Sequence, residues 1–141
     1  MLALSIRQPY AALILRGVKT IEYRSRPTRI VGTRFYLYAA GKWPTRRTRR
    51  VRAAAKAWSL DLAVPGQDAN ADVPPWMAEL ANGLRLFPHD LHTGVIVGSA
   101  IIDKVDQRDD GMWQWHLAGV QRAKQLRKPT GHPQPVWFTP F

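Results

Sequence analysis

The sequence predicts a single α+β domain in which several strands form a small mixed β-barrel with one early helix. The chain has 141 residues, which is enough to bury one ordinary core but not two. Hydrophobic residues make up 45% of it and six residues are Trp, a composition typical of a folded protein. Short runs rich in Ile, Val and aromatic residues lie between Gly and Pro turns, which favours strands.

The first forty residues predict a strand, a short helix and two more strands. A weakly alternating run at residues 2–5 ends at the turn formed by Gln8 and Pro9. The helix is expected at residues 10–16, because Pro9 suits its first turn and Gly17 suits its end. Strands follow at residues 19–25 and 33–39, where Thr, Ile and aromatic side chains suit a pleated surface.

Residues 41–92 are expected to form an insertion, a basic helix followed by an acidic loop, within the one domain that spans residues 1–141. Apolar residues at helical spacing form one narrow face of residues 44–60, and basic residues surround it. That apolar face comprises Val51, Ala54, Ala55 and Trp58. Residues 61–75 are acidic and turn-forming, and residues 75–81 predict a second short helix. Neither piece can bury a core of its own, so neither is a separate domain.

The remaining strands are expected after residue 93. Residues 94–105 are an almost continuous apolar run, in which Gly98 indicates a bulge or a sharp bend. Residues 112–117 alternate aromatic and polar side chains, and residues 136–138 predict the last strand. Residues 120–126 fit a strand or a helix. A strand is preferred because the barrel needs one more, and residues 129–133 then form a turn of hairpin length.

The charge distribution favours a polyanionic partner. The formal net charge is +11, and residues 1–60 contain fourteen Lys or Arg against one acid, Glu22. Because each neutralised phosphate releases counterions, RNA is the expected partner, with DNA as the alternative polyanion. The candidates for contact with the phosphate backbone are Lys42, Arg46, Arg47, Arg49 and Arg50. The competing interpretation is that the charge only aids solubility.

Other classes of site are not expected. The chain contains no Cys, which excludes disulfides and Cys-based zinc or iron sites. His89 and His92 lie three residues apart, but no further His or Glu completes a ligand set of recognisable spacing, so neither a metal nor a cofactor is expected. The first apolar run is far too short for a signal sequence or a membrane span, and the expected location is the cytoplasm.

Residues 19–25 contain the most informative chemistry. In a regular strand one face contains Thr20, Glu22 and Arg24, and the other contains Lys19, Ile21 and Tyr23. Spacing leaves two interpretations of Glu22 open: an ion pair with a neighbouring cation, or a pocket carboxylate that accepts hydrogen bonds from a base edge or moves a proton. Lys19 can share the face of Glu22 only if it lies in the turn after Gly17, before regular pleating begins.

Residues 4–11, LSIRQPYA, and residues 17–24, GVKTIEYR, resemble the signature of the ASCH family, the activating signal cointegrator homology domains. Weaker similarity extends to residues 36–40 and 94–98, and to Gly131 and Trp137. The resemblance implies a PUA-like β-barrel with a cleft beside the first helix, in a superfamily that commonly binds RNA. The residues implied to line this cleft are Ser5, Gln8, Pro9, Tyr10, Lys19, Glu22 and Arg24.

The function implied by the resemblance is recognition of RNA or a nucleotide-like ligand. Gln8 has both a donor and an acceptor for a base edge, Tyr10 offers a ring for stacking, and the charged residues suit a phosphate. A third class of function, a protein-interaction module in a transcription or translation assembly, would use the acidic insertion instead.

Some ASCH-like proteins are enzymes, which cleave RNA or hydrolyse the amide of acylated cytidines. The second activity is understood to use the motif lysine with a threonine two residues before the arginine, where this sequence has Glu22. That difference weighs against an acylcytidine amidohydrolase. The ribonuclease alternative remains, with Glu22 as the base for the 2'-hydroxyl and with Lys19 and Arg24 as the cations that stabilise the developing phosphorane charge.

Overall fold

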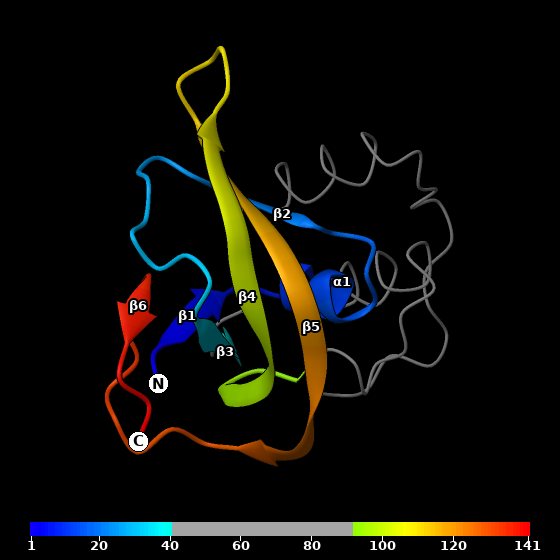
Figure 1. Cartoon of the computed structure of the whole chain (residues 1–141). Coiled ribbons are helices and arrows are strands. Elements are labelled where there is room, and N and C mark those ends of the chain that lie inside the picture. The colour runs from blue at the N-terminus through cyan, green and yellow to red at the C-terminus, as the bar shows by residue number, and fades with distance from the viewer. Residues whose placement is uncertain (41–91) are drawn as a thin grey trace, which may run out of the picture.

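A computed structural model describes residues 1–40 and 92–141 of the chain (Figure 1). Its elements are β1 (Ala3–Ile6), α1 (Tyr10–Leu15), β2 (Ile21–Arg24), β3 (Arg34–Ala39), β4 (Val95–Gln107), β5 (Trp113–Arg127) and β6 (Trp137–Phe138). The described part is mostly β with one short helix, and the first four elements lie within two residues of their predicted bounds. The two helices predicted at residues 44–60 and 75–81 lie outside the described residues.

Helix α1 has the apolar sequence YAALIL. Four consecutive residues, Ala11 to Ile14, are buried, so the helix packs its whole central turn against the sheet. It ends at Gly17, whose φ of 76° is the left-handed conformation that glycine adopts without steric cost. The Gly17 amide donates to the Ile14 carbonyl at 3.0 Å, which closes the last turn.

The strands form one six-stranded sheet in the order β2-β5-β4-β3-β1-β6. Strand β1 pairs parallel to β3, and the other neighbours are antiparallel. The long β4–β5 hairpin dominates the sheet and projects beyond it at the tip (Figure 1). The short strand β2 pairs only with the first residues of β5, from Trp113 to His116.

Two predictions for the C-terminal third are wrong. Residues 112–117 and 120–126 do not form separate strands but one strand, β5, of 15 residues. Gly119, with φ 57°, does not end the strand. Strand β4 is long enough to pair with β5 on both sides of Gly119, and the β4–β5 register shifts on either side of this glycine. Residues 129–133 are therefore not a hairpin turn, since β6 pairs with β1 rather than with β5.

The sheet is not closed into a barrel by backbone pairing within the described residues, so the barrel part of the predicted fold is not confirmed. Side chains nevertheless connect strands that are distant in the sheet order. Trp115 of β5 stacks on Trp137 of β6, with ring centroids 5.8 Å apart. Arg24 Nη2 of β2 donates to the Ser5 carbonyl of β1 at 2.9 Å. The sheet must therefore curl strongly around its core.

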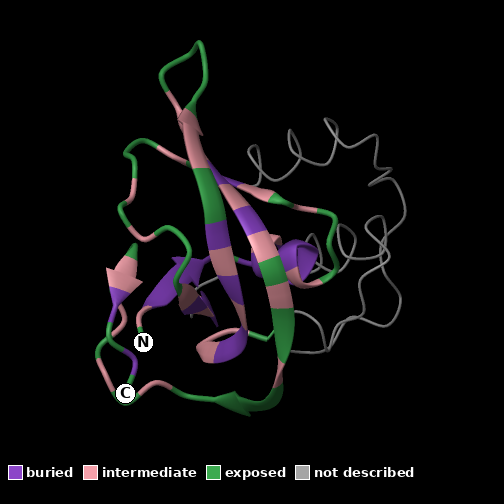
Figure 2. Cartoon of the chain, in the orientation of Figure 1, coloured by how far each residue is buried: buried purple, intermediate pink, exposed green. Residues whose placement is uncertain are grey.

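The core lies inside this curl, beneath α1. Buried residues are concentrated on α1, on β1 and along the middle of β4 and β5, whereas the hairpin tip and the far end of β5 are exposed (Figure 2). The main cluster consists of Leu4, Ile6, Ala11, Ile14, Phe35, Leu37, Ala39, Val97, Ala100, Ile102, Trp115 and Leu117. In the part of the chain that the structure describes, no helix has the length and apolarity needed to cross a membrane.

The predicted irregularity at Gly98 is confirmed, because the β4–β5 register shifts between Ile96 and Gly98. A Cβ at this position would lie 2.7 Å from Leu15 Cδ2 and closer still to the Gln121 carbonyl oxygen. Both distances are shorter than van der Waals contact. The glycine therefore allows α1 and β5 to approach β4 closely.

We expect Gly98→Ala to lower the free energy of unfolding by about 1–3 kcal/mol, because the added methyl must displace backbone as well as the Leu15 side chain. Urea denaturation measures the change. Ser25→Ala introduces the same residue at an exposed position and is the control, which should be nearly neutral. Equal stability of Gly98→Ala and the unsubstituted protein would contradict the close approach.

Candidate functional site

Lys19 reaches Glu22 because regular pleating has not begun at its position. Strand β2 starts only at Ile21, so Lys19 lies in the turn after α1, as the sequence required for the two side chains to meet. Lys19 Nζ lies 3.3 Å from Glu22 Oε2 and donates to the Ile21 carbonyl at 2.6 Å. The lysine side chain is mostly buried along this path, with 10% of its surface exposed.

Glu22 lies between two cations. Its other oxygen, Oε1, is 3.0 Å from Arg24 Nε, and the residue as a whole is 9% exposed. Within the described residues the Arg24 Nε–H makes no aligned hydrogen bond, so this contact is ionic rather than directional. One carboxylate and two cations leave the cluster with a formal charge of +1.

The Arg24 guanidinium is fixed from several sides. Its Nη2 donates to the Ser5 carbonyl, and its Cζ lies 5.7 Å from the centroid of the Trp115 ring. Trp115 is itself held by a 3.1 Å hydrogen bond from its indole nitrogen to the Arg26 carbonyl. Such a guanidinium is preorganised, because little side-chain entropy remains to be lost when it binds a ligand.

Two tyrosine rings flank the lysine. Lys19 Nζ lies 5.7 Å from the centroid of Tyr10 and 5.2 Å from that of Tyr23. Tyr23 is 40% exposed, and the guanidinium of Arg108, from the hairpin tip, lies 5.1 Å from the same ring. Sequence reasoning assigned Tyr23 no role. The sequence does place Tyr23 on the same strand face as Lys19, and that alternation indicates their contact. No feature of the nearby sequence indicates that Arg108 lies beside Tyr23.

Four of the residues implied to line the cleft are buried: Glu22, described above, and Ser5, Gln8 and Pro9. The Ser5 hydroxyl donates to the Gln134 carbonyl. Gln8 Oε1 accepts from the Ala12 amide at 3.1 Å, and its Nε2 donates to the His92 carbonyl at 2.8 Å. Pro9 is also fully buried. The polar groups of Ser5 and Gln8 are thus engaged inside the protein, while Tyr10, Lys19 and Arg24 retain partly exposed surface.

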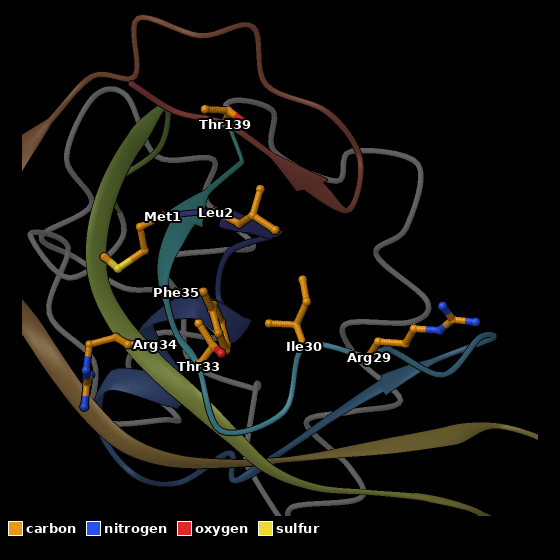
Figure 3. A pocket seen from close by; sticks show the side chains of 8 residues that line it. All are labelled: Met1, Leu2, Arg29, Ile30, Thr33, Arg34, Phe35 and Thr139. Carbon is orange, nitrogen blue, oxygen red and sulfur yellow. The ribbon is translucent and has the colours of Figure 1, made fainter.

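A cavity of about 350 Å³ lies elsewhere on the molecule (Figure 3). Leu2, Ile30 and Phe35 point toward it, and the Arg29 guanidinium points away. Its lining consists of Met1, Leu2, Arg29, Ile30, Thr33, Arg34, Phe35 and Thr139. None of the residues predicted to bind ligand belongs to this lining.

Ser99 and His116 do not form a nucleophile and base pair. Arg34 Nη1 donates to Ser99 Oγ at 2.9 Å, whereas His116 Nε2 lies 3.1 Å from Asp106 Oδ2. The hairpin register places Lys104, not Ser99, opposite His116. Nor do residues 1–40 and 92–141 contain a group of three or more His, Asp or Glu side chains that could hold a metal ion.

The predicted phosphate-backbone contacts lie outside the described residues. They are Lys42, Arg46, Arg47, Arg49 and Arg50.

Comparison with known proteins identifies a family. The family model described as the ASCH domain matches residues 4–129, on both sides of the residues that the structure does not describe. No curated protein matches the chain.

We expect Glu22→Gln to lower the free energy of unfolding by about 1–3 kcal/mol, because it leaves the cations of Lys19 and Arg24 close together without their carboxylate. Asp103→Asn makes the same chemical change at an exposed position and should be nearly neutral. Urea denaturation of both variants checks this, and a Glu22→Gln loss no larger than that of Asp103→Asn would rule out the buried ionic cluster.

The Asp106 carboxylate makes the stability of the β4–β5 hairpin depend on pH in the acid range. Burial opposes its ionisation, but hydrogen bonds from Lys104 and His116 outweigh burial and hold the pKa of Asp106 below its ordinary value. A depressed carboxyl pKa stabilises the fold above the unfolded pKa, and this contribution is lost as pH falls through the folded value. The loss is therefore confined to pH below about 4.

Melting temperatures of the unsubstituted protein and of Asp106→Asn, measured from pH 7 down to pH 2, test this. The difference between the two proteins should be constant above about pH 5 and should shrink in acid. A difference that stays constant down to pH 2 would contradict the lowered pKa of Asp106.

Proposed function

Because the chain belongs to the ASCH domain family, we propose that it binds RNA and recognises one nucleotide beside helix α1. The family is generally associated with RNA binding. The residues proposed to form the nucleotide site are Ser5, Gln8, Pro9, Tyr10, Lys19, Glu22 and Arg24. The observation on which the proposal depends most is the cluster of Lys19, Glu22 and Arg24. In it one carboxylate holds two cations close together, and all three side chains are mostly buried.

The cluster suits a phosphate group. Its formal charge is +1, and its cations are mostly shielded from solvent, where dissolved salt screens them less. Lys19 and Arg24 are both donors without acceptor capacity, and hydrogen bonds from such groups to phosphate are charge-assisted. Glu22 has a positioning role in this account, because it holds the two cations where a phosphate can meet both.

The aromatic side chains suit a base. Tyr10 and Tyr23 lie on either side of the Lys19 ammonium, so a nucleotide whose phosphate contacts the lysine would have a ring within reach for stacking. Gln8 is less accessible than the resemblance implied, since both ends of its amide contact the protein backbone. Its proposed part is therefore to shape the floor of the site.

We extend the proposal to the whole of residues 1–141 as one domain, with residues 41–92 inserted as a basic helix and an acidic loop. Its support is that the family match spans residues 4–129 and so continues on both sides of the insertion. The basic residues at positions 42–50 would then contact the phosphate backbone, on the ground of their charge.

The ribonuclease alternative is the weaker one. A general base needs a carboxylate oxygen available to a proton, and each Glu22 oxygen lies within 3.3 Å of a cation. Fixed cations beside an occupied carboxylate favour binding over cleavage.

Binding of labelled single-stranded RNA by the unsubstituted protein and by Lys19→Gln tests the proposal. Loss of one charge-assisted contact should weaken binding about tenfold or more. Arg29→Gln removes the same charge from an exposed position away from the cluster and should change the affinity less than about threefold.

Equal weakening in both variants would mean that only net charge matters and would overturn the site. Absence of RNA affinity at low salt would overturn the function itself. The same tubes, analysed for strand breaks, decide the alternative: cleavage by the unsubstituted protein but not by Lys19→Gln would support a ribonuclease, and intact RNA in both would remove it.

A further inference from the structure

Four basic residues follow one another closely near the end of strand β5. We call them the basic segment; they are Arg122, Lys124, Arg127 and Lys128. All four are exposed, and the end of β5 that contains them is largely exposed in Figure 2. No Asp or Glu occurs anywhere in residues 111–141, so this part of the sequence contributes only positive charge.

The basic segment lies where β5 is no longer paired with β2 and is paired irregularly with β4. On one side, pairing with β2 stops at His116, and the last hydrogen bond runs from the Leu117 amide to the Thr20 carbonyl at 2.8 Å. On the other side, β5 advances from Arg122 to Arg127 while β4 advances only from Gly98 to Ile96. Residues 123–126 therefore form a bulge between the paired positions Arg122 and Arg127.

An aromatic ring lies at one end of the basic segment. The Arg127 guanidinium is 3.9 Å from the centroid of the Phe141 ring, and that ring is 44% exposed. Tyr36 holds the ring from its edge, with centroids 5.7 Å apart. A guanidinium over an aromatic ring offers a surface on which a nucleobase can stack.

The same strand connects the basic segment to the proposed nucleotide site. Trp115 is paired across the strands with Glu22, and Arg122 follows seven residues later on β5. At the rise of an extended strand this separation is about 23 Å. Single-stranded nucleic-acid sites on small β domains extend over roughly 4–16 nucleotides, so one strand of RNA can reach both places.

We propose that the basic segment of β5 is a second contact surface for single-stranded RNA, which binds the phosphates of nucleotides beyond the one held at Lys19 and Arg24. The four exposed cations supply the donors that phosphate contacts use. This inference rests on the proposed function. It adds that RNA of several nucleotides is bound more tightly than a single nucleotide.

A competing explanation exists for lysines at an open strand edge, since their charge also prevents edge-to-edge pairing between molecules. The two explanations differ in what neutralisation does. Loss of a phosphate contact weakens RNA binding and reduces its salt dependence, whereas loss of edge protection increases self-association and leaves RNA binding unchanged.

The test uses the full chain with Lys124→Gln and Lys128→Gln combined, and Arg26→Gln with Arg29→Gln as the control. The control removes two equally exposed cations from the loop between β2 and β3. Affinities for a labelled 20-nucleotide oligouridylate and for a trinucleotide of uridine are measured over a series of KCl concentrations. Circular dichroism and size-exclusion chromatography verify that each variant is folded and report its state of association.

For the 20-nucleotide RNA, the β5 variant should lose about 1.4 from the slope of log affinity against log salt, which is about 0.7 for each of two contacts on a single strand. The control should keep the slope of the unsubstituted protein. The trinucleotide is too short to reach from Lys19 to the basic segment, so its affinity should be the same in all three proteins.

An unchanged slope in the β5 variant, while the unsubstituted protein still binds the long RNA, would overturn this inference and leave the proposed function standing. Self-association of that variant with unaltered RNA affinity would overturn it in the same way, because edge protection would then explain the lysines. No RNA binding by the unsubstituted protein at low salt would overturn both proposals together.

Discussion

The Trp115 indole is the group on which both the fold and the candidate site depend. It is 2% exposed, its ring stacks on Trp137, and its N–H donates to the Arg26 carbonyl. Through these contacts β5 meets β6 and the end of β2, although the three are not all neighbours in the sheet. Because its ring also lies beside the Arg24 guanidinium, the interaction that curls the sheet is the one that positions a charged group of the site.

The sequence predicted what short-range chemistry determines. Pro9 and Gly17 delimit α1, and Gly17 also places Lys19 in a turn from which it reaches Glu22. Long-range pairing was not predictable from local pattern. The register of the hairpin makes residues 113–127 one strand and brings Arg108 to Tyr23, and neither outcome leaves a trace in spacing. Nor does spacing reveal that the Gln8 amide is occupied by backbone at both ends, because its Nε2 donates to the distant His92 carbonyl while its Oε1 accepts from the nearby Ala12 amide.

Glu22 shows why its two interpretations, an ion pair or a pocket carboxylate, need not compete. The structure contains the ion pair, with Lys19 on one oxygen and Arg24 on the other. A carboxylate that holds two cations close together offsets their mutual repulsion, which would otherwise move the flexible lysine toward solvent. The ion pair therefore maintains the local positive charge at a fixed place, and that place is lined by tyrosine rings.

The incomplete closure of the sheet has a consequence for its dynamics. Strand β6 pairs with β1 at only two positions, and it is held to β5 by the tryptophan stack. Separating β5 from β6 therefore breaks no ladder hydrogen bond between them, and such openings need less free energy than unfolding of the whole domain. Amide protons of β6 should exchange with solvent sooner than those of β3, which has a partner strand on each side. The molecule thus has a built-in order of opening that begins at its C-terminal strand.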